Sequence, residues 1–255
     1  NPSKVDMTYS KWANSCWFTC TNSYTWTNCE TAPPPYLSCT WVNTPTPFSA
    51  TTTYGWCDTA DIIVCSWNGT WYMIAACNVW TNTASIAYND AGWYWELFQW
   101  WNNAWIRSVW TSPTQISVTD IDSTYSSATF IYDTADWNTT QNDNLWWNGT
   151  DTDESRKWPC LTWYHVPSQP EWAWIHTAWW WGTSWLNMSN ALKMPVAGNR
   201  NWSDAALNDQ NFHGYYWSTS PNGTREYHMH FNPASIHPNN YSNRAYGFSV
   251  RCFKN

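Results

Sequence analysis

Histidines gather towards the C-terminal end of the sequence, where four of the six lie between residues 211 and 255. Their spacings lack the tight repeat of a metal-binding motif, and no Gly-x-Ser-x-Gly element supplies the nucleophile of a hydrolase. The same segment is rich in Tyr, Asn and Ser, which make adaptable contacts in binding surfaces. The segment is therefore predicted to bind a ligand rather than to catalyse a reaction. These histidines are His213, His228, His230 and His237.

Nine cysteines offer a second kind of chemistry, and six of them fall within the first 65 residues. Cys16 and Cys20 could form half of a zinc site, but no second closely spaced pair accompanies them. Disulfides are the favoured interpretation, and they indicate an extracellular or cell-surface location. Their connectivity does not follow from the spacing, because many pairings are allowed.

Carboxylates and amides are concentrated between Asn142 and Asp153, and oxygen ligands of this kind can hold Ca²⁺. The spacing is not that of an EF-hand, so solvated turns are the favoured interpretation and calcium is the alternative. No other cofactor is predicted. The same interpretation applies to Asp120, Asp122, Asp133 and Asp136.

Charged residues make up only 11% of the chain, and the formal net charge is −7. Proteins that bind nucleic acid or an anionic membrane surface carry a basic patch, so neither partner is predicted. The longest apolar runs, at residues 62–64 and 72–76, are too short to span a membrane and are predicted to be buried strands. A homo-oligomer is compatible with the sequence.

The elements that would position these residues are short. Ser168, followed three residues later by Glu171, forms a capping box, which predicts a helix from there to about residue 178. His165, just before it, is expected to hydrogen-bond the local backbone. A shorter helix is predicted to begin at Ser203 and to cover residues 204–208. The fold class is therefore α+β, with two short helices, small antiparallel sheets and a high loop content.

The composition changes at about residue 56. Residues 1–56 are rich in Cys, Thr and Pro and lack periodicity, which is typical of a stapled module or stalk. Residues 57–255 are predicted to form one domain.

Three sequence blocks carry a resemblance to a known family. They are PCLTWYHVPSQPEW at residues 159–172, LKMPVAGNR at 192–200 and RAYGFSVRC at 244–252; the short block GYYWS at 214–218 fits too, and residues 73–79 and 97–100 fit the start of the same domain. In this order they resemble bacterial proteins with a C-type-lectin-like fold, related to formylglycine-generating enzymes. The resemblance covers roughly residues 60–255. It implies that the first helix meets the last strand, and hence a disulfide between Cys160 and Cys252.

Many members of that family look like variable proteins of diversity-generating retroelements, which rewrite adenines near the 3′ end of a gene. The resemblance implies a variable ligand-binding region at about residues 208–246. Tyr216 and Trp217 fall in a constant block and are expected to pack beneath the site. The exposed, ligand-contacting residues are expected to be Phe212, His213, Tyr215, Arg225, Tyr227, His228, His230, Asn232, His237, Asn239 and Tyr241.

Tryptophan is unusually frequent, with 27 residues against 9 glycines. Several of these tryptophans, including Trp163, stand where the resembling blocks carry Gly. We therefore consider the hypothesis that the natural gene reads UGA as glycine; the alternative is a genuinely Trp-rich protein. On this hypothesis the following are natively Gly: Trp67, Trp71, Trp80, Trp93, Trp95, Trp101, Trp105, Trp110, Trp147, Trp158, Trp163, Trp174, Trp179, Trp180 and Trp185. Those expected to be genuine are Trp100, Trp137, Trp146, Trp172, Trp202 and Trp217.

Three classes of function compete. The leading one is a non-enzymatic receptor or adhesin, secreted or on the cell surface, whose site is diversified by a retroelement and binds a protein or glycan on another cell or surface. The second is a carbohydrate-binding module with exposed Trp platforms. The third is an oxidase of the formylglycine-generating type, which needs copper-binding cysteines near the C-terminus, where only Cys252 lies.

Overall fold

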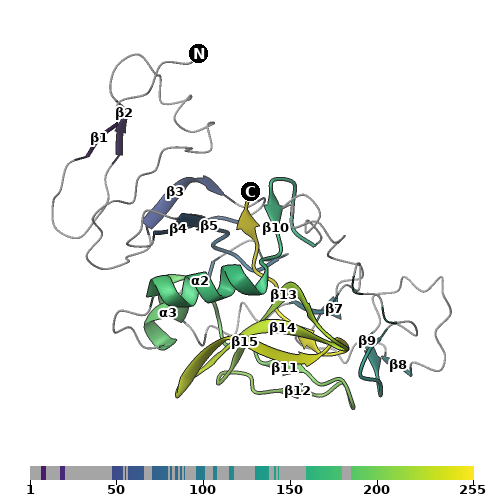
Figure 1. Ribbon diagram of the computed structural model, residues 1–255. Coiled ribbons are helices and arrows are strands. Elements are labelled where there is room, and N and C mark those ends of the chain that lie inside the picture. Colours follow the sequence, from purple (N-terminus) through teal and green to yellow (C-terminus); the bar gives the residue numbers. More distant parts are fainter. Residues whose placement is uncertain are drawn as a thin grey trace.

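The computed structural model describes two short helices and several small sheets (Figure 1). This agrees with the predicted mixed class of short helices and small antiparallel sheets. The described residues are 7–9, 18–20, 48–53, 55, 57–65, 71–79, 81, 84, 85, 87, 89, 96–100, 106, 107, 115–117, 130–137, 141, 143, 159–179 and 185–255.

The first sheet has five antiparallel strands in the order β10-β17-β5-β4-β3. Ile62 and Val64 are buried, which confirms the predicted strand there. Because β3 pairs with β4, this sheet begins before the boundary expected at about residue 56. The strands are β3 (Phe48–Thr53), β4 (Ala60–Cys65), β5 (Trp71–Ile74), β10 (Tyr164–His165) and β17 (Phe253–Lys254).

The second sheet has the order β12-β11-β16-β6-β7. Gln99 on β6 is fully buried and ties this sheet to β9. Its Nε2 donates to the carbonyls of Ile131 at 2.7 Å and Ala245 at 2.8 Å, and its Oε1 accepts the Ile131 N–H at 2.9 Å. The strands are β6 (Glu96–Gln99), β7 (Ile106–Arg107), β11 (Asn199–Arg200), β12 (Leu207–Asn208) and β16 (Gly247–Phe248).

The third sheet is a meander of the three longest strands at the C-terminal end, β13 (Gly214–Asn222), β14 (Arg225–Asn232) and β15 (Ser235–Asn243). Gly223, with a φ of 61°, lies in the first hairpin turn, where a positive φ favours glycine. Two further strand pairs are small: β1 (Met7–Tyr9) with β2 (Phe18–Cys20), and the parallel pair β8 (Gln115–Ser117) with β9 (Phe130–Tyr132).

Helix α2 (Gln169–Trp179) confirms the predicted helix, and it lies between the first and third sheets (Figure 1). The Ser168 N–H donates to Glu171 Oε2 at 2.7 Å, as a capping box requires. The Trp172 ring is fully buried, with its centroid 5.1 Å from that of Phe253. Among the described helices none is long and apolar enough to cross a membrane.

The prediction of a second helix beginning at Ser203 is wrong. Asp204 Oδ1 accepts the Ala206 N–H at 3.0 Å, and Ala205 has a φ of 57°. Such side-chain bonds to nearby backbone compete with helix formation, so the segment turns and enters β12 instead. The second helix is α3 (Trp185–Ala191), which the sequence pattern did not indicate.

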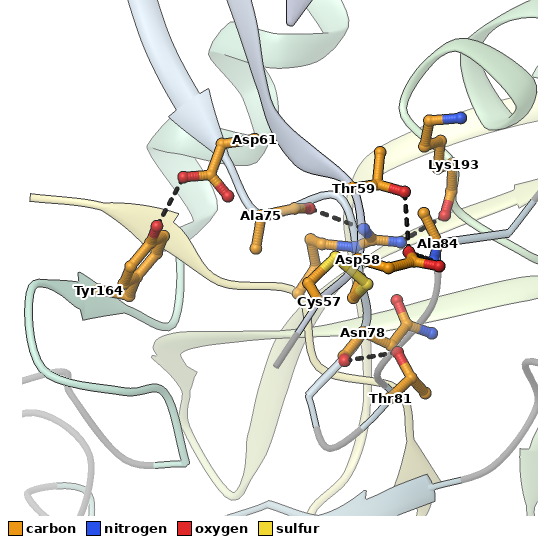
Figure 2. The surroundings of a disulfide bond; sticks show 12 residues. Cys57, Asp58, Thr59, Asp61, Ala75, Asn78, Thr81, Ala84, Tyr164 and Lys193 are labelled. Atoms are coloured by element: carbon orange, nitrogen blue, oxygen red, sulfur yellow. Dashed lines mark hydrogen bonds between the residues drawn. A yellow bond between two sulfur atoms is a disulfide. The ribbon is translucent and has the colours of Figure 1, made fainter. Parts of the chain in front are cut away.

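Two disulfides join distant segments of the described chain. Cys160 and Cys252 are bonded, as predicted, with their Cα atoms 5.8 Å apart. Cys57 and Cys77 form a second bond beside Asp58, whose carboxylate accepts hydrogen bonds from Thr59 and Ala84 (Figure 2). The side chains of the other five N-terminal cysteines lie outside the described part of the structure.

Candidate functional site

The residues expected to contact ligand lie on the three-stranded sheet β13–β15 and on the loop that precedes it (Figure 1). Successive side chains of a strand point to opposite faces. His228 and His230 therefore face one side of β14, whereas Arg225 and Tyr227 face the other. The predicted set is thus divided between two faces of the sheet.

The first group, here called the histidine cluster, consists of His213, Tyr215, His230 and His237. Cross-strand pairing places His230 opposite both Tyr215 and His237. The ring centroid of His230 lies 4.7 Å from that of Tyr215 and 5.8 Å from that of His237. His213 Nδ1 lies 2.9 Å from His230 Nε2. Phe212, which is 56% exposed, stacks on His213 and extends the cluster towards solvent.

Two ionisable groups of this cluster, His230 and Tyr215, have shifted pKa values that leave them uncharged at neutral pH. Burial, followed by the charges of His213 and His237, lowers the pKa of His230 to about 4, so its imidazole is uncharged at pH 7. Burial and a hydrogen bond to Asp209 raise the pKa of Tyr215 well above its usual range. The Tyr215 hydroxyl donates to Asp209 Oδ2 at 2.8 Å. The neutral His230 ring is thus held in a hydrogen-bonded array, with its two nitrogens near His213 Nδ1 and Asn240 Nδ2.

The second group, here called the tyrosine pair, consists of Tyr227 and Tyr241 with Arg225 beside them. The two tyrosine rings meet edge to face, with centroids 6.4 Å apart. The Arg225 guanidinium lies 5.5 Å from the Tyr241 ring centroid, and both of these side chains are exposed. Amphipathic rings of this kind suit recognition of a protein or sugar surface.

Two of the expected contact residues have structural roles. His228 is fully buried, with its ring centroid 4.8 Å from that of Phe248, so the expectation that it contacts ligand is wrong. Burial lowers the pKa of His228 to about 3. Asn232 forms the turn between β14 and β15, where its Oδ1 accepts the N–H groups of Ala234 and Ser235. Asn239 is exposed on β15.

Tyr216 and Trp217, the two residues of β13 that were expected to pack beneath the site, are buried. Trp217 is fully buried and its Nε1 donates to the Phe98 carbonyl at 2.6 Å. Tyr216 is also fully buried, and its hydroxyl donates to the Pro195 carbonyl at 2.8 Å. Burial raises the pKa of Tyr216 to about 12. The polar atoms of these two buried rings are therefore both hydrogen-bonded.

A buried ionic network holds the turn end of this sheet. The Arg244 guanidinium lies 2.8 Å from Glu226 Oε1 and contacts both Asp136 and Asp143. It also lies 4.7 Å from the Trp100 ring centroid. Asp136 and Asp143, interpreted from the sequence as solvated turn residues with calcium binding as the alternative, thus contact a guanidinium. The remaining residues of 142–153 and Asp120 and Asp122 lie outside the described ranges.

The cysteines and His165 are engaged in structure. The described residues contain one compact trio of potential metal ligands, Cys57, Asp58 and Cys77, but its two sulfurs are bonded to each other. Cys252 is buried in its own disulfide, which leaves no thiol there for the oxidase chemistry considered above. His165 was expected to bond the backbone, but its ring contacts the side chains of Glu171 and Asn255 at 2.9 and 2.7 Å.

The two tryptophan sets drawn from the sequence overlap in burial, since Trp174 and Trp185 of one and Trp137 and Trp202 of the other are half-buried, but their extremes differ. Trp100, Trp172 and Trp217 are fully buried, and each indole N–H donates to a backbone carbonyl. Trp163 is 67% exposed and has a φ of 71°, a conformation that favours glycine. Among the tryptophans whose side chains the structure describes, Trp163 is the only exposed one, so a platform of several exposed indoles is not seen there.

Two residues of the site escaped sequence reasoning. Asp209, in the loop before β13, accepts hydrogen bonds from Tyr215 and from Asn199 Nδ2, the latter at 3.0 Å. Asn240 Nδ2 lies 3.5 Å from His230 Nδ1. Asp209 stands inside the predicted variable region, but only the fold shows that β11 and β13 converge on it. No family model matches this chain, and no curated protein or solved structure matches it either.

Proposed function

We propose that this chain is a non-enzymatic, secreted or cell-surface ligand-binding protein, a receptor or adhesin, with a C-type-lectin-like domain at residues 57–255. The carrying observation is the contrast across the sheet β13–β15. Phe212, before β13, and His237 and Tyr241, on β15, are exposed, whereas Tyr216 and Trp217 of β13 are fully buried. Binding surfaces combine buried residues that keep the backbone rigid with exposed aromatic and polar side chains that can be exchanged.

The proposal of a C-type-lectin-like domain rests on the contact between the two ends of residues 60–255, the region that carries the resemblance. Strand β17, close to the C-terminus, pairs with β5 and with β10. The disulfide between Cys160 and Cys252 fixes the same junction next to α2. Two disulfides in the described part also suit an oxidising, extracellular compartment.

Diversification by a retroelement is part of the same proposal. The exposed positions tolerate exchange because their side chains contribute little to the core, whereas the buried positions do not. The test is the DNA that surrounds the gene. A reverse transcriptase gene and a near-copy of the last coding segment, differing from it at adenines, are expected. Their absence from a complete genome would contradict diversification without touching ligand binding.

Ligand binding is tested by screening the purified protein against arrays of cell-surface proteins and of glycans, in buffer that contains EDTA. A hit is expected to lose binding in Phe212→Ala or Tyr241→Ala. Thr162→Ala, an exposed change far along the chain from the sheet, serves as the matched control and is expected to bind as the wild type does. Equal binding by all three variants would place the ligand elsewhere.

A further inference from the structure

We propose that the surface beside the histidine cluster binds an arginine side chain of a protein ligand. The proposal rests on the proposed ligand-binding function and names one chemical group that the ligand presents. Four side chains, here called the guanidinium site, carry it: Asn199, Asp204, Asp209 and Tyr246. Asn199 is on β11, Asp204 and Asp209 lie on either side of β12, and Tyr246 precedes β16.

Asp209 connects this site to the histidine cluster. Its Oδ2 accepts hydrogen bonds from Asn199 Nδ2 at 3.0 Å and from the Tyr215 hydroxyl at 2.8 Å. The rings of Tyr215 and Tyr246 both stack on Phe248, with centroids 4.9 and 5.3 Å from that of Phe248. These contacts bring a carboxylate, an amide and two tyrosine rings from separate segments to one part of the surface.

Two acceptor atoms of the site lack a donor. Asn199 is only 5% exposed, and its Oδ1 is buried without a hydrogen-bond partner among the described residues. Both side-chain hydrogen bonds that Asp209 accepts end on its Oδ2, and no described side chain donates to its Oδ1. A buried acceptor without a donor costs free energy. A ligand that brings several N–H groups offsets this cost.

The site is negatively charged. Asp204 and Asp209 are exposed, and neither forms an ion pair with a described residue. Burial raises the pKa of Tyr246; a hydrogen bond with Trp202 opposes this, and the negative charges of Asp209 and Asp204 add to it. Both carboxylates therefore lie close enough to act on this ring. Their charge favours a cationic ligand.

Two neighbouring side chains are already engaged. Tyr215 stacks on two other rings, whereas half-buried Tyr246 stacks on one, so Tyr246 is the ring with a face for a ligand. Arg200 follows Asn199 on β11, so its side chain points to the opposite face of that strand. It donates to the Ala205 carbonyl in the interior.

A guanidinium matches this set of groups better than an ammonium does. It carries five N–H donors in one plane, whereas the lysine ammonium is a compact point charge. The plane stacks on the Tyr246 ring while its edge donates to Asp209 and Asn199. The protein uses the same combination in its interior, where the Arg244 guanidinium lies 4.7 Å from the Trp100 ring centroid and contacts carboxylates.

The experiment titrates the isotope-labelled full chain with a short acetylated and amidated peptide of alternating glycine and arginine, followed by nuclear magnetic resonance. Salt at about 0.15 M screens exposed charges. Saturable shifts of the amide resonances of Asn199, Asp209 and Tyr246 are expected. The matched peptide carries citrulline, the uncharged isostere of arginine, and is expected to bind at least about tenfold more weakly. Equal affinity for the two peptides would overturn the proposal.

Asp209→Asn keeps an acceptor for the Tyr215 hydroxyl but removes the charge, so it is expected to weaken binding of the arginine peptide at least about fivefold. Asp58→Asn is the matched control, because Asp58 is an exposed aspartate outside the site that also accepts hydrogen bonds. It is expected to bind as the wild type does. Equal losses in both variants would indicate a non-specific attraction of charges, and no loss in either would place the peptide elsewhere; both results contradict the site.

Failure of this proposal is distinguishable from failure of ligand binding in general. A ligand from the arrays that binds the wild type and Asp209→Asn equally would overturn the guanidinium site and leave the ligand-binding function standing. Absence of any ligand on the arrays would count against that function alone, because the two peptides test the site directly.

Discussion

The hydrogen bonds of individual tryptophans show which indoles the fold uses. Trp100, Trp137, Trp172 and Trp217 donate their N–H groups to the carbonyls of Ser218, Trp100, Trp217 and Phe98. A buried indole needs such a partner, so Trp100, Trp172 and Trp217 are integral to the core, whereas Trp137 is half-buried. Trp163 has no comparable packing because most of its side chain faces solvent.

Replacing Trp163 with Gly is expected to stabilise the protein by about 1 kcal/mol. A non-glycine residue in the left-handed region costs roughly 1–2 kcal/mol, from which the greater freedom of Gly in the unfolded chain subtracts part. Urea denaturation of both proteins measures the difference. This result would support a native glycine at position 163.

Trp174→Gly provides the contrast, because Trp174 lies inside α2 with its ring centroid 4.8 Å from that of Tyr72. Gly inside a helix costs about 1 kcal/mol, and loss of the aromatic contact adds to this. We expect destabilisation by about 2 kcal/mol in total. Equal destabilisation by both changes would show that backbone strain at Trp163 is not the controlling factor.

At the scale of elements, the start of α2 depends on the carboxylate of Glu171, which contacts several hydrogen-bond donors. Glu171 Oε2 accepts from the Ser168 N–H and hydroxyl, and Oε1 lies 2.9 Å from His165 Nε2. Glu171→Ala would leave these donors buried without an acceptor, and we expect a loss of about 3 kcal/mol. Ser168→Ala removes only the cap hydroxyl and is expected to cost about 1 kcal/mol.

Chemical denaturation measures this order of effects. Thr177→Ala, on the exposed side of the same helix, is the control and should stay within about 0.5 kcal/mol of the wild type. A loss from Ser168→Ala as large as that from Glu171→Ala would assign the stability to the hydroxyl alone.

Gln99 links elements that are distant in the sequence. Its carboxamide is the partner of three backbone groups in Ile131 and Ala245. Gln99→Leu keeps the volume but leaves those groups unpaired, so we expect a loss of about 3 kcal/mol, measured by thermal and urea unfolding. Gln169→Leu, a partly exposed position on α2, is the control. A loss below about 1 kcal/mol would show that β9 holds its place without this side chain.

Elements with local signals were predictable, and those built by long-range contacts were not. Ser168 and Glu171 are neighbours in sequence, so the capping box marked α2 correctly. Near Ser203 the same kind of local reasoning failed, because Asn and Asp side chains bonded the backbone and formed turns. The candidate site was predicted as a region, but strand register decides which side chains reach solvent. That register buries His228 and places His230 beside His213.

At the scale of the whole molecule, the network around Arg244 ties stability to pH. One guanidinium faces three carboxyl groups, those of Glu226, Asp136 and Asp143. Burial is the main cause that raises the pKa of Glu226, to about 10; Arg244 opposes it, and Asp143 and Asp136 add to it. Neither Glu226 oxygen has an aligned hydrogen bond among the described residues. Burial therefore favours the protonated form of Glu226 in the folded state, against the pull of Arg244.

A carboxyl group whose pKa is raised by folding makes the folded state bind more protons than the unfolded state. The stabilisation by Glu226 is fully present below its pKa in the unfolded chain, near 4.5. It is lost as the pH rises towards its pKa in the folded state, about 10. The loss is about 1.4 kcal/mol per pH unit at most. Buried His228 titrates in the opposite sense, but its contribution is complete above its unfolded value of 6.5.

Glu226→Gln separates this effect from all others, because the amide imitates the protonated carboxyl. Between about pH 6.5 and 8.5 the wild type is expected to lose about 2.7 kcal/mol relative to the variant, measured by urea denaturation at several pH values. The variant should also be the more stable protein at pH 7. If the free energies of unfolding of the two proteins change with pH in parallel, Arg244 keeps Glu226 ionised. The buried network then stabilises the fold as an ion pair, without a proton on Glu226.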